Sequence, residues 1–160
     1  MDETNEHIDN MVAFVKPGEV VMASCQDKND PQYEMCKKTK KALMNAVDAK
    51  GRKLIIHEIP LPNPALYESK EESKSICAGR NHAKERSAGS RLAASYINFY
   101  QGEKFVVMPA FGVKEDKVAY EKIKELFPDK KIHQVYTREI LLGGGNIHCI
   151  TMQIPEGENK

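Results

Sequence analysis

The sequence has no apolar run long enough to cross a membrane, for which about 18 consecutive residues are needed. It has no excess of either charge, because its 24 Lys and Arg residues are matched by 23 Asp and Glu residues. Composition therefore gives no reason to expect a nucleic acid or an anionic membrane as a partner. The four cysteines form no CxxC pair, and the first residues, MDETNEH, are acidic and polar, unlike a secretion signal. We expect a soluble, core-forming protein of the reducing cytoplasm.

Familiar phosphate-binding and hydrolase motifs are also missing. No GxGxxG, GxxxxGK(S/T) or GxSxG segment occurs, so nucleotide binding and serine hydrolysis have no motif in their favour. The HxD pair of His7 and Asp9 is a weak metal signal, and no further His or Cys stands at ligand spacing. We expect no metal site.

The first part of the chain predicts the order strand, strand, helix, strand. Residues 10–24 contain two segments of strand formers around the turn KPGE, which is typical of a hairpin. Asp30 and Pro31 form a cap and first-turn pair that opens a helix, and residues 54–59 form an apolar strand that ends at Pro60. This predicts a ββαβ unit over about residues 10–60.

The second part repeats that order over about residues 92–136. Strands are expected at 92–99 and 104–108, a helix at 115–127 and a closing strand at 132–136, followed by a final strand at 147–154. The segment GEVVM near residue 20 is echoed by GEKFVVM near residue 105. Short Val- and Met-rich strands are common, so this echo can also arise by chance. Together with the repeated order, it favours an α/β repeat architecture.

The segment GGGNIHCIT contains the strongest candidate for a reactive group, Cys149. The three glycines before it permit positive φ angles and let backbone N–H groups approach a ligand closely. On a strand, Cys149 and His148 lie on opposite faces, so His148 would point away from the thiol. Cys149 is either a nucleophile or a buried cysteine beside a flexible turn.

The N-terminus provides candidate partners for a reactive thiol. If this segment is extended, His7 and Asp9 share a face. An imidazole can shuttle protons for a thiol, and a carboxylate can hold a cationic substrate. The alternative is a polar tail in solvent.

Three segments of the sequence resemble the agmatine deiminases, in the peptidylarginine deiminase-like branch of the guanidino-modifying enzymes. They are DETNEHIDN at 2–10, RLAASYINFY at 91–100 and REILLGGGNIHCIT at 138–151. The resemblance implies the pentein fold, in which five ββαβ modules surround a pseudo-fivefold axis. A complete member of the family is more than twice as long as this chain. We therefore expect an incomplete propeller, the C-terminal part with about two and a half of five modules.

The resemblance also implies a reaction that needs no cofactor: hydrolysis of the agmatine guanidinium to N-carbamoylputrescine and ammonia. By the same resemblance, Cys149 is the nucleophile that forms a covalent intermediate, and His7 is the general acid and base. Asp9 is the carboxylate that pairs with the guanidinium nitrogens. The remaining residues that the resemblance places at the substrate are Asp2, Gly144 and Gly145.

Two features depart from the family pattern. A second guanidinium-binding carboxylate is expected from an earlier module that this sequence does not contain. Ser24 and Cys25, and separately Ser90, stand where a Trp-containing and an acidic motif are expected, and the sequence has no Trp. Activity is therefore expected to be incomplete in the isolated chain.

Several alternatives and partners follow. The expected ligand is a small guanidino cation, and either a second copy or a complementary N-terminal chain could complete the fold. The chain could instead belong to a bacterial-type peptidylarginine deiminase, or be an inactive fragment that serves only as an assembly module. A His/Asp metal hydrolase is a third, weaker hypothesis, which metal dependence would test.

Overall fold

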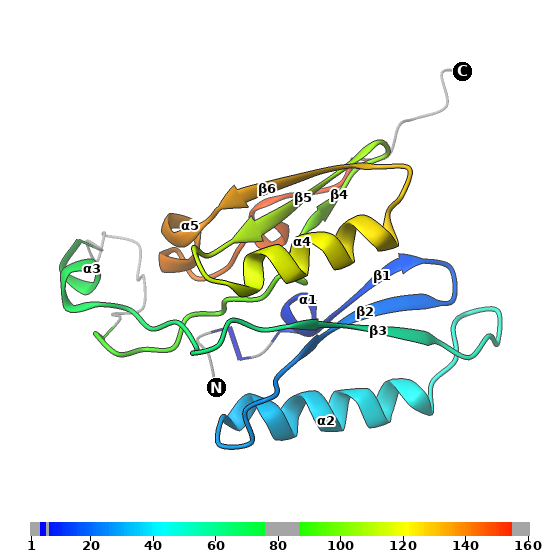
Figure 1. The fold of residues 1–160 in the computed structure, drawn as a ribbon, viewed down its shortest axis with the longest axis horizontal. Helices are drawn as coiled ribbons and strands as arrows, with labels where there is room; N and C mark the ends of the chain where they lie inside the picture. The colour runs from blue at the N-terminus through cyan, green and yellow to red at the C-terminus, as the bar shows by residue number, and fades with distance from the viewer. Residues whose placement is uncertain (1–3, 6, 76–86, 155–160) are drawn as a thin grey trace.

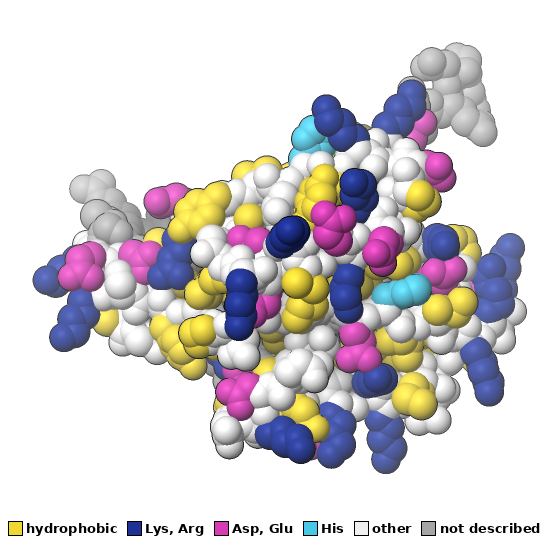
Figure 2. Space-filling view, in the orientation of Figure 1, with side chains coloured by type: hydrophobic (Ala, Val, Ile, Leu, Met, Phe, Trp, Pro, Cys, Tyr) yellow, Lys and Arg dark blue, Asp and Glu magenta, His cyan; other side chains and the backbone are white. Residues whose placement is uncertain are grey.

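The computed structural model of the chain describes residues 4–5, 7–75 and 87–154. Two three-stranded sheets form its framework (Figure 1). Among the described residues, no helix is both long and apolar enough to pass through a bilayer. On the face drawn in Figure 2, basic and acidic side chains are interspersed.

The first sheet belongs to a unit that begins with a short helix. Its central strand pairs antiparallel with the strand before it and parallel with the strand after it. The elements in order are α1 (Ile8–Met11), β1 (Val12–Lys16), β2 (Glu19–Ser24), α2 (Pro31–Met44) and β3 (Ile55–Pro60).

The second sheet repeats this arrangement, with β5 antiparallel to β4 and parallel to β6. The helix α3 (Lys70–Ser75) precedes it in the chain. The remaining elements are β4 (Tyr100–Gln101), β5 (Phe105–Ala110), α4 (Glu115–Leu126), β6 (Lys131–Tyr136), α5 (Arg138–Leu142) and the 3-10 helix η1 (His148–Ile150).

The expected order of strand, strand, helix, strand is confirmed in both units. The two sheets have the same strand order and the same pairing directions. Neither sheet closes on itself within the described residues. The number of modules in a complete propeller, and the assignment of the whole chain to one such domain, stay predictions.

The helix α2 begins where the sequence predicts. The Asp30 carboxylate accepts the backbone N–H of Gln32 at 2.8 Å, and Pro31 occupies the first turn. Both oxygens of the same carboxylate also accept from the Arg91 guanidinium, at 2.6 and 2.9 Å. The cap of α2 therefore also ties the first unit to the segment that opens the second.

The core alternates along β2, as expected for a central strand covered on both faces. Val21 and Ala23 belong to the large cluster that contains Ile123 of α4. Met22 belongs to a smaller cluster with Cys36 of α2. Thus α4 lies between the two sheets, and α2 covers the other face of the first sheet (Figure 1).

Two predicted strands are wrong. Residues 92–99 form an irregular segment, and only Tyr100–Gln101 pairs with β5. Within that segment Ser95 and Asn98 are buried, and their side chains bond to α1 and to η1. Buried polar side chains must be hydrogen-bonded, and these bonds draw the segment out of the ladder.

The final strand expected at 147–154 is also absent. Residues His148–Ile150 form η1 instead, and residues 151–154 are exposed and have no regular structure. The backbone N–H groups of His148 and Cys149 bond to the Asn98 side chain instead of a neighbouring strand. The apolar alternation of this segment therefore does not reflect a half-buried strand.

Candidate functional site

Glycine makes room for the thiol of Cys149. A Cβ atom on Gly145 would lie 2.8 Å from Cys149 Cβ and 3.0 Å from its Sγ, which is closer than side chains tolerate. The preceding Gly144 has φ of +95°, a conformation that L side chains rarely adopt. The loop after α5 thus depends on these two glycines for its path and for the position of the sulfur.

Four described side chains meet at the site, those of Asp9, Asn98, His148 and Cys149. Cys149 Sγ donates to Asp9 Oδ2 at 3.3 Å and accepts from Asn98 Nδ2 at 3.2 Å. His148 Nδ1 lies 2.9 Å from the same Asp9 Oδ2. The prediction that His148 points away from the thiol is therefore wrong, because the two residues lie in a helical turn rather than on a strand.

The surroundings of Asp9 favour its ionised form. Burial would raise the pKa of this carboxyl. The hydrogen bonds of His148, Cys149 and Asn98 act in the opposite direction, and the net effect lowers the pKa below its ordinary value. A carboxylate beside a thiol can hold a cation next to a nucleophile.

The other predicted residues are placed differently. His7 does not share an extended face with Asp9, because α1 begins at Ile8 and puts Asp9 in its first turn. His7 is exposed, and its carbonyl accepts the backbone N–H of Asn10 at 2.9 Å. No hydrogen bond or ion pair of the His7 imidazole occurs among the described residues. Asp2 lies outside the described residues.

The site borders an open hollow. Asp9 and His148 line a depression of about 250 Å³, whose walls also include Val12, Phe14 and Phe99. It is large enough for a small organic ion. Within the described residues, no group of three or more His, Cys, Asp or Glu side chains is arranged to hold a metal ion.

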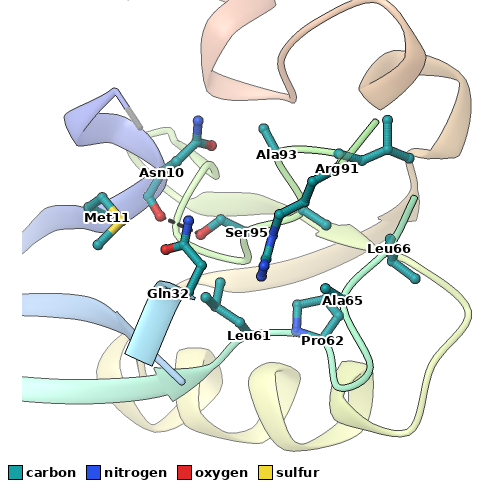
Figure 3. Close-up of a pocket in the computed structure, with 12 residues that line it drawn as sticks. Asn10, Met11, Gln32, Leu61, Pro62, Ala65, Leu66, Arg91, Ala93 and Ser95 are labelled. Carbon is teal, nitrogen blue, oxygen red and sulfur yellow. Dashed lines mark hydrogen bonds between the residues drawn. The ribbon is translucent and has the colours of Figure 1, made fainter. Parts of the chain in front are cut away.

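A second cavity, lined in part by Asn10 and Met11 of α1, is too small for such a ligand. Its volume is about 20 Å³. Figure 3 shows Asn10, Gln32, Leu61 and Arg91 around it. The Ser95 hydroxyl donates to the Asn10 carbonyl at 2.6 Å beside it (Figure 3). It is a packing gap at the junction of the two units.

Two residues of the site, Asn98 and His148, were not predicted from the sequence to contact Cys149 or Asp9. Asn98 was part of the segment RLAASYINFY, but was interpreted as one position of a strand. An Asn enclosed by Ile and Phe is unusual for an apolar strand, since a buried amide needs partners. That pattern is the one signal in the sequence that could have identified it.

The geometry defines a class of site: an exposed thiol on a glycine-rich loop, flanked by a carboxylate and an amide donor. The profile of the Porphyromonas-type peptidyl-arginine deiminase family matches residues 1–155. The chain belongs to this family.

Individual relatives agree with the family match. A protein of Shewanella sp. (strain W3-18-1), named as a candidate agmatine deiminase, is 51% identical over 158 residues, covering 99% of this chain and 42% of that protein. The solved agmatine deiminase of Enterococcus faecalis is 36% identical with a TM-score of 0.84, over 96% of this chain and 41% of that one. A C. jejuni agmatine deiminase with a cysteine replaced by serine and substrate bound is 25% identical, with a TM-score of 0.68, over 92% of this chain and 36% of that one. The chain therefore spans less than half the length of these relatives.

Proposed function

We propose that this chain is the cysteine-bearing part of an agmatine deiminase-like hydrolase. The observation that carries the proposal is the 3.3 Å contact between Cys149 Sγ and Asp9 Oδ2, which joins residues 140 positions apart. A guanidinium carbon is electron-poor and its nitrogens are cationic, so it suits a thiol nucleophile beside a carboxylate. The relatives named as agmatine deiminases support this substrate class.

In the proposed reaction, Asp9 pairs with the guanidinium nitrogens and turns the carbon toward Cys149. The sulfur attacks that carbon, the C–N bond to one terminal nitrogen breaks, and this nitrogen leaves as ammonia after taking a proton. Water then attacks the resulting thiouronium carbon and releases the sulfur. Agmatine and one water thus give N-carbamoylputrescine and ammonia.

We assign the proton transfers to His7, the substrate's cationic end to Asp2, and the wall beside the thiol to Gly144 and Gly145. His7 is exposed at the N-cap of α1, two residues from Asp9, so an imidazole there can reach a ligand held at the carboxylate. His148 already bonds Asp9 and would fix its orientation.

The proposal includes the cytoplasm as location and a further polypeptide as partner. Cys25, Cys36 and Cys149 are free thiols, as suits a reducing compartment. Because the relatives are more than twice as long, we propose that a second copy or a complementary N-terminal chain supplies further carboxylates. No nucleic acid, membrane, metal or cofactor is part of the proposed reaction.

Ammonia release from agmatine by the purified chain tests the proposal, with Cys149→Ser and Asp9→Asn as inactive variants. Cys36→Ser is the matched control, because burial raises the pKa of that thiol to about 11 and leaves it inert. We expect turnover that both site variants abolish and that Cys36→Ser retains. Equal turnover in Cys149→Ser would contradict the assignment.

A folded chain without turnover is assayed again with the N-terminal part of a relative added as a separate chain. Turnover restored by that addition supports the partner, whereas none under either condition favours an inactive assembly module. The family match also favours a second substrate, peptidyl-arginine. If ammonia were released faster from a blocked arginine peptide than from agmatine, the proposed substrate would be peptidyl-arginine and not agmatine.

A further inference from the structure

Asn98 forms hydrogen bonds with both the sulfur and the backbone N–H of the proposed nucleophile, Cys149. It is fully buried, and it lies in the irregular segment that replaces a predicted strand. Its Oδ1 accepts the backbone N–H of His148 at 2.8 Å and that of Cys149 at 3.4 Å. Its Nδ2 lies 3.2 Å from Cys149 Sγ.

The surroundings fix which end of this amide faces the sulfur. The backbone N–H groups at Oδ1 can only donate, so an NH₂ group in that place would meet two donors. On the other side, Nδ2 also approaches the Asp9 carbonyl at 3.4 Å and Asn10 Oδ1 at 3.1 Å. A carbonyl can only accept, so the amide end that faces Asp9 and Cys149 is the donor.

The amide is held rigidly from the first unit. Asn10 Nδ2 donates to the Thr4 hydroxyl at 3.1 Å, which turns Asn10 Oδ1 toward Asn98. The Asn10 carbonyl accepts from the Ser95 hydroxyl at 2.6 Å. Asn10 and Ser95 are both buried, so this network has little freedom to rearrange.

We propose that Asn98 is a catalytic residue whose amide donates to Cys149 Sγ and stabilises the thiolate. The inference rests on the proposed function only in taking Cys149 as the reacting thiol. Among the described residues, two titratable groups lie around the sulfur. Asp9 of α1 accepts a hydrogen bond from the thiol, and His148 of η1 is hydrogen-bonded to Asp9. Asp9 favours the protonated thiol, whereas a neutral N–H donor favours the anion and stays in place after the proton leaves.

The test follows alkylation of Cys149 by iodoacetamide against pH, with the Cys149 peptide quantified by mass spectrometry. In Asn98→Ala the pH of half-maximal rate should rise by about one unit, because a hydrogen bond to a charged group changes the equilibrium about tenfold. In Asn98→Asp the rise should be larger, since a carboxylate replaces the donor. The maximal rate at high pH should not fall in either variant.

The matched control is Tyr96→Phe, which removes a buried hydroxyl from the same segment. Its hydroxyl donates to Asp116 at 2.6 Å and does not contact Cys149 in the described structure. We expect a similar loss of stability without a change of pH midpoint. An unchanged midpoint in both Asn98 variants, or an equal rise in Tyr96→Phe, would overturn the proposal.

A second measurement uses the unsubstituted side chain, in case the Asn98 variants fail to fold. The ¹⁵N-labelled side-chain amide of Asn98 should shift in NMR spectra at the pH where Cys149 alkylation is half-maximal. That shift should disappear in Cys149→Ala, and its persistence there would count against the contact. Neither measurement uses agmatine. A chain that releases no ammonia even with the N-terminal chain added, but shows the expected midpoint rise in the Asn98 variants, would refute the proposed function and leave the Asn98 contact intact.

Discussion

The two ββαβ units differ most in their first strand. In the first unit β1 has five residues and pairs along β2 from Val12 to Lys16. In the second unit β4 has two residues, and the chain before it is irregular. The buried polar side chains of Ser95 and Asn98 lie in that irregular part.

The difference places the candidate site where the repeat is broken. A full strand at 92–99 would use its backbone groups in the ladder and alternate its side chains between two faces. The irregular segment instead directs Asn98 toward both Asp9 and Cys149. In the second unit, residues that could pair with β5 as a strand contact the candidate site instead.

The largest expected loss of stability comes from the central strands, β2 and β5. It tests whether the two strands are packed equally well in the two units. Met22 of β2 and Met108 of β5 are both completely buried. We expect Met22→Ala and Met108→Ala each to lower the free energy of unfolding by about 2–5 kcal/mol, measured by urea denaturation. Met44→Ala is the control, since Met44 is 65% exposed and its loss should cost about 0.5 kcal/mol or less. If either Met22→Ala or Met108→Ala lowered the free energy of unfolding by no more than Met44→Ala does, the two units would be packed differently in their centres.

A smaller loss of stability is expected from a change in the glycine loop that follows α5. The second unit continues into this loop, and the first unit has no counterpart of it in the described part of the chain. Gly145→Ala places a Cβ against Cys149, so we expect a loss of about 1–3 kcal/mol in unfolding free energy and a changed rate of Cys149 alkylation. Gly51→Ala is the control: its φ is +77°, but a Cβ there meets nothing within 4 Å. It should be destabilising through backbone strain and leave the alkylation rate unchanged. Identical alkylation rates in both variants would mean that the sulfur does not depend on Gly145.

The smallest effect concerns the ion pair between the connector and the second unit. The hydrogen bond from Arg138, with that of the Ser69 N–H, lowers the pKa of Glu72 from 4.5 to about 2. A lowered folded-state pKa stabilises the protein above about pH 4.5, and this contribution is lost as the pH falls toward 2. We therefore expect Glu72→Gln to lower the free energy of unfolding at pH 7 by at most about 1 kcal/mol, seen as a lower melting temperature. The difference from the unsubstituted chain should shrink below pH 4.5.

The matched control for that ion pair is Glu34→Gln. Glu34 pairs with Lys37 at 3.6 Å, and both side chains are mostly exposed. Its melting temperature should stay close to that of the unsubstituted chain at every pH. If the melting temperature of Glu72→Gln differed from that of the unsubstituted chain by the same amount at every pH, the effect would be due to packing and not to charge.

The elements that the sequence predicts correctly are those specified by neighbours in the chain. Asp30 and Pro31 begin α2, and the helix expected at 115–127 is α4 at Glu115–Leu126. Turn residues and apolar spacing act within a few positions, so they are readable without tertiary contacts. The two wrong strands have strand-like spacing, but their backbone groups bond to distant side chains.

The sequence by itself determined the two-unit order, the family resemblance and the choice of Cys149 and Asp9. Only the tertiary structure decided that Cys149 lies on a 3-10 turn between Asp9 and Asn98. Those contacts join residues 140 and 51 positions apart, so no local pattern of spacing encodes them. They form because packing the second unit against the first buries Asn98, and a buried amide must bond to whatever polar groups the fold brings to it.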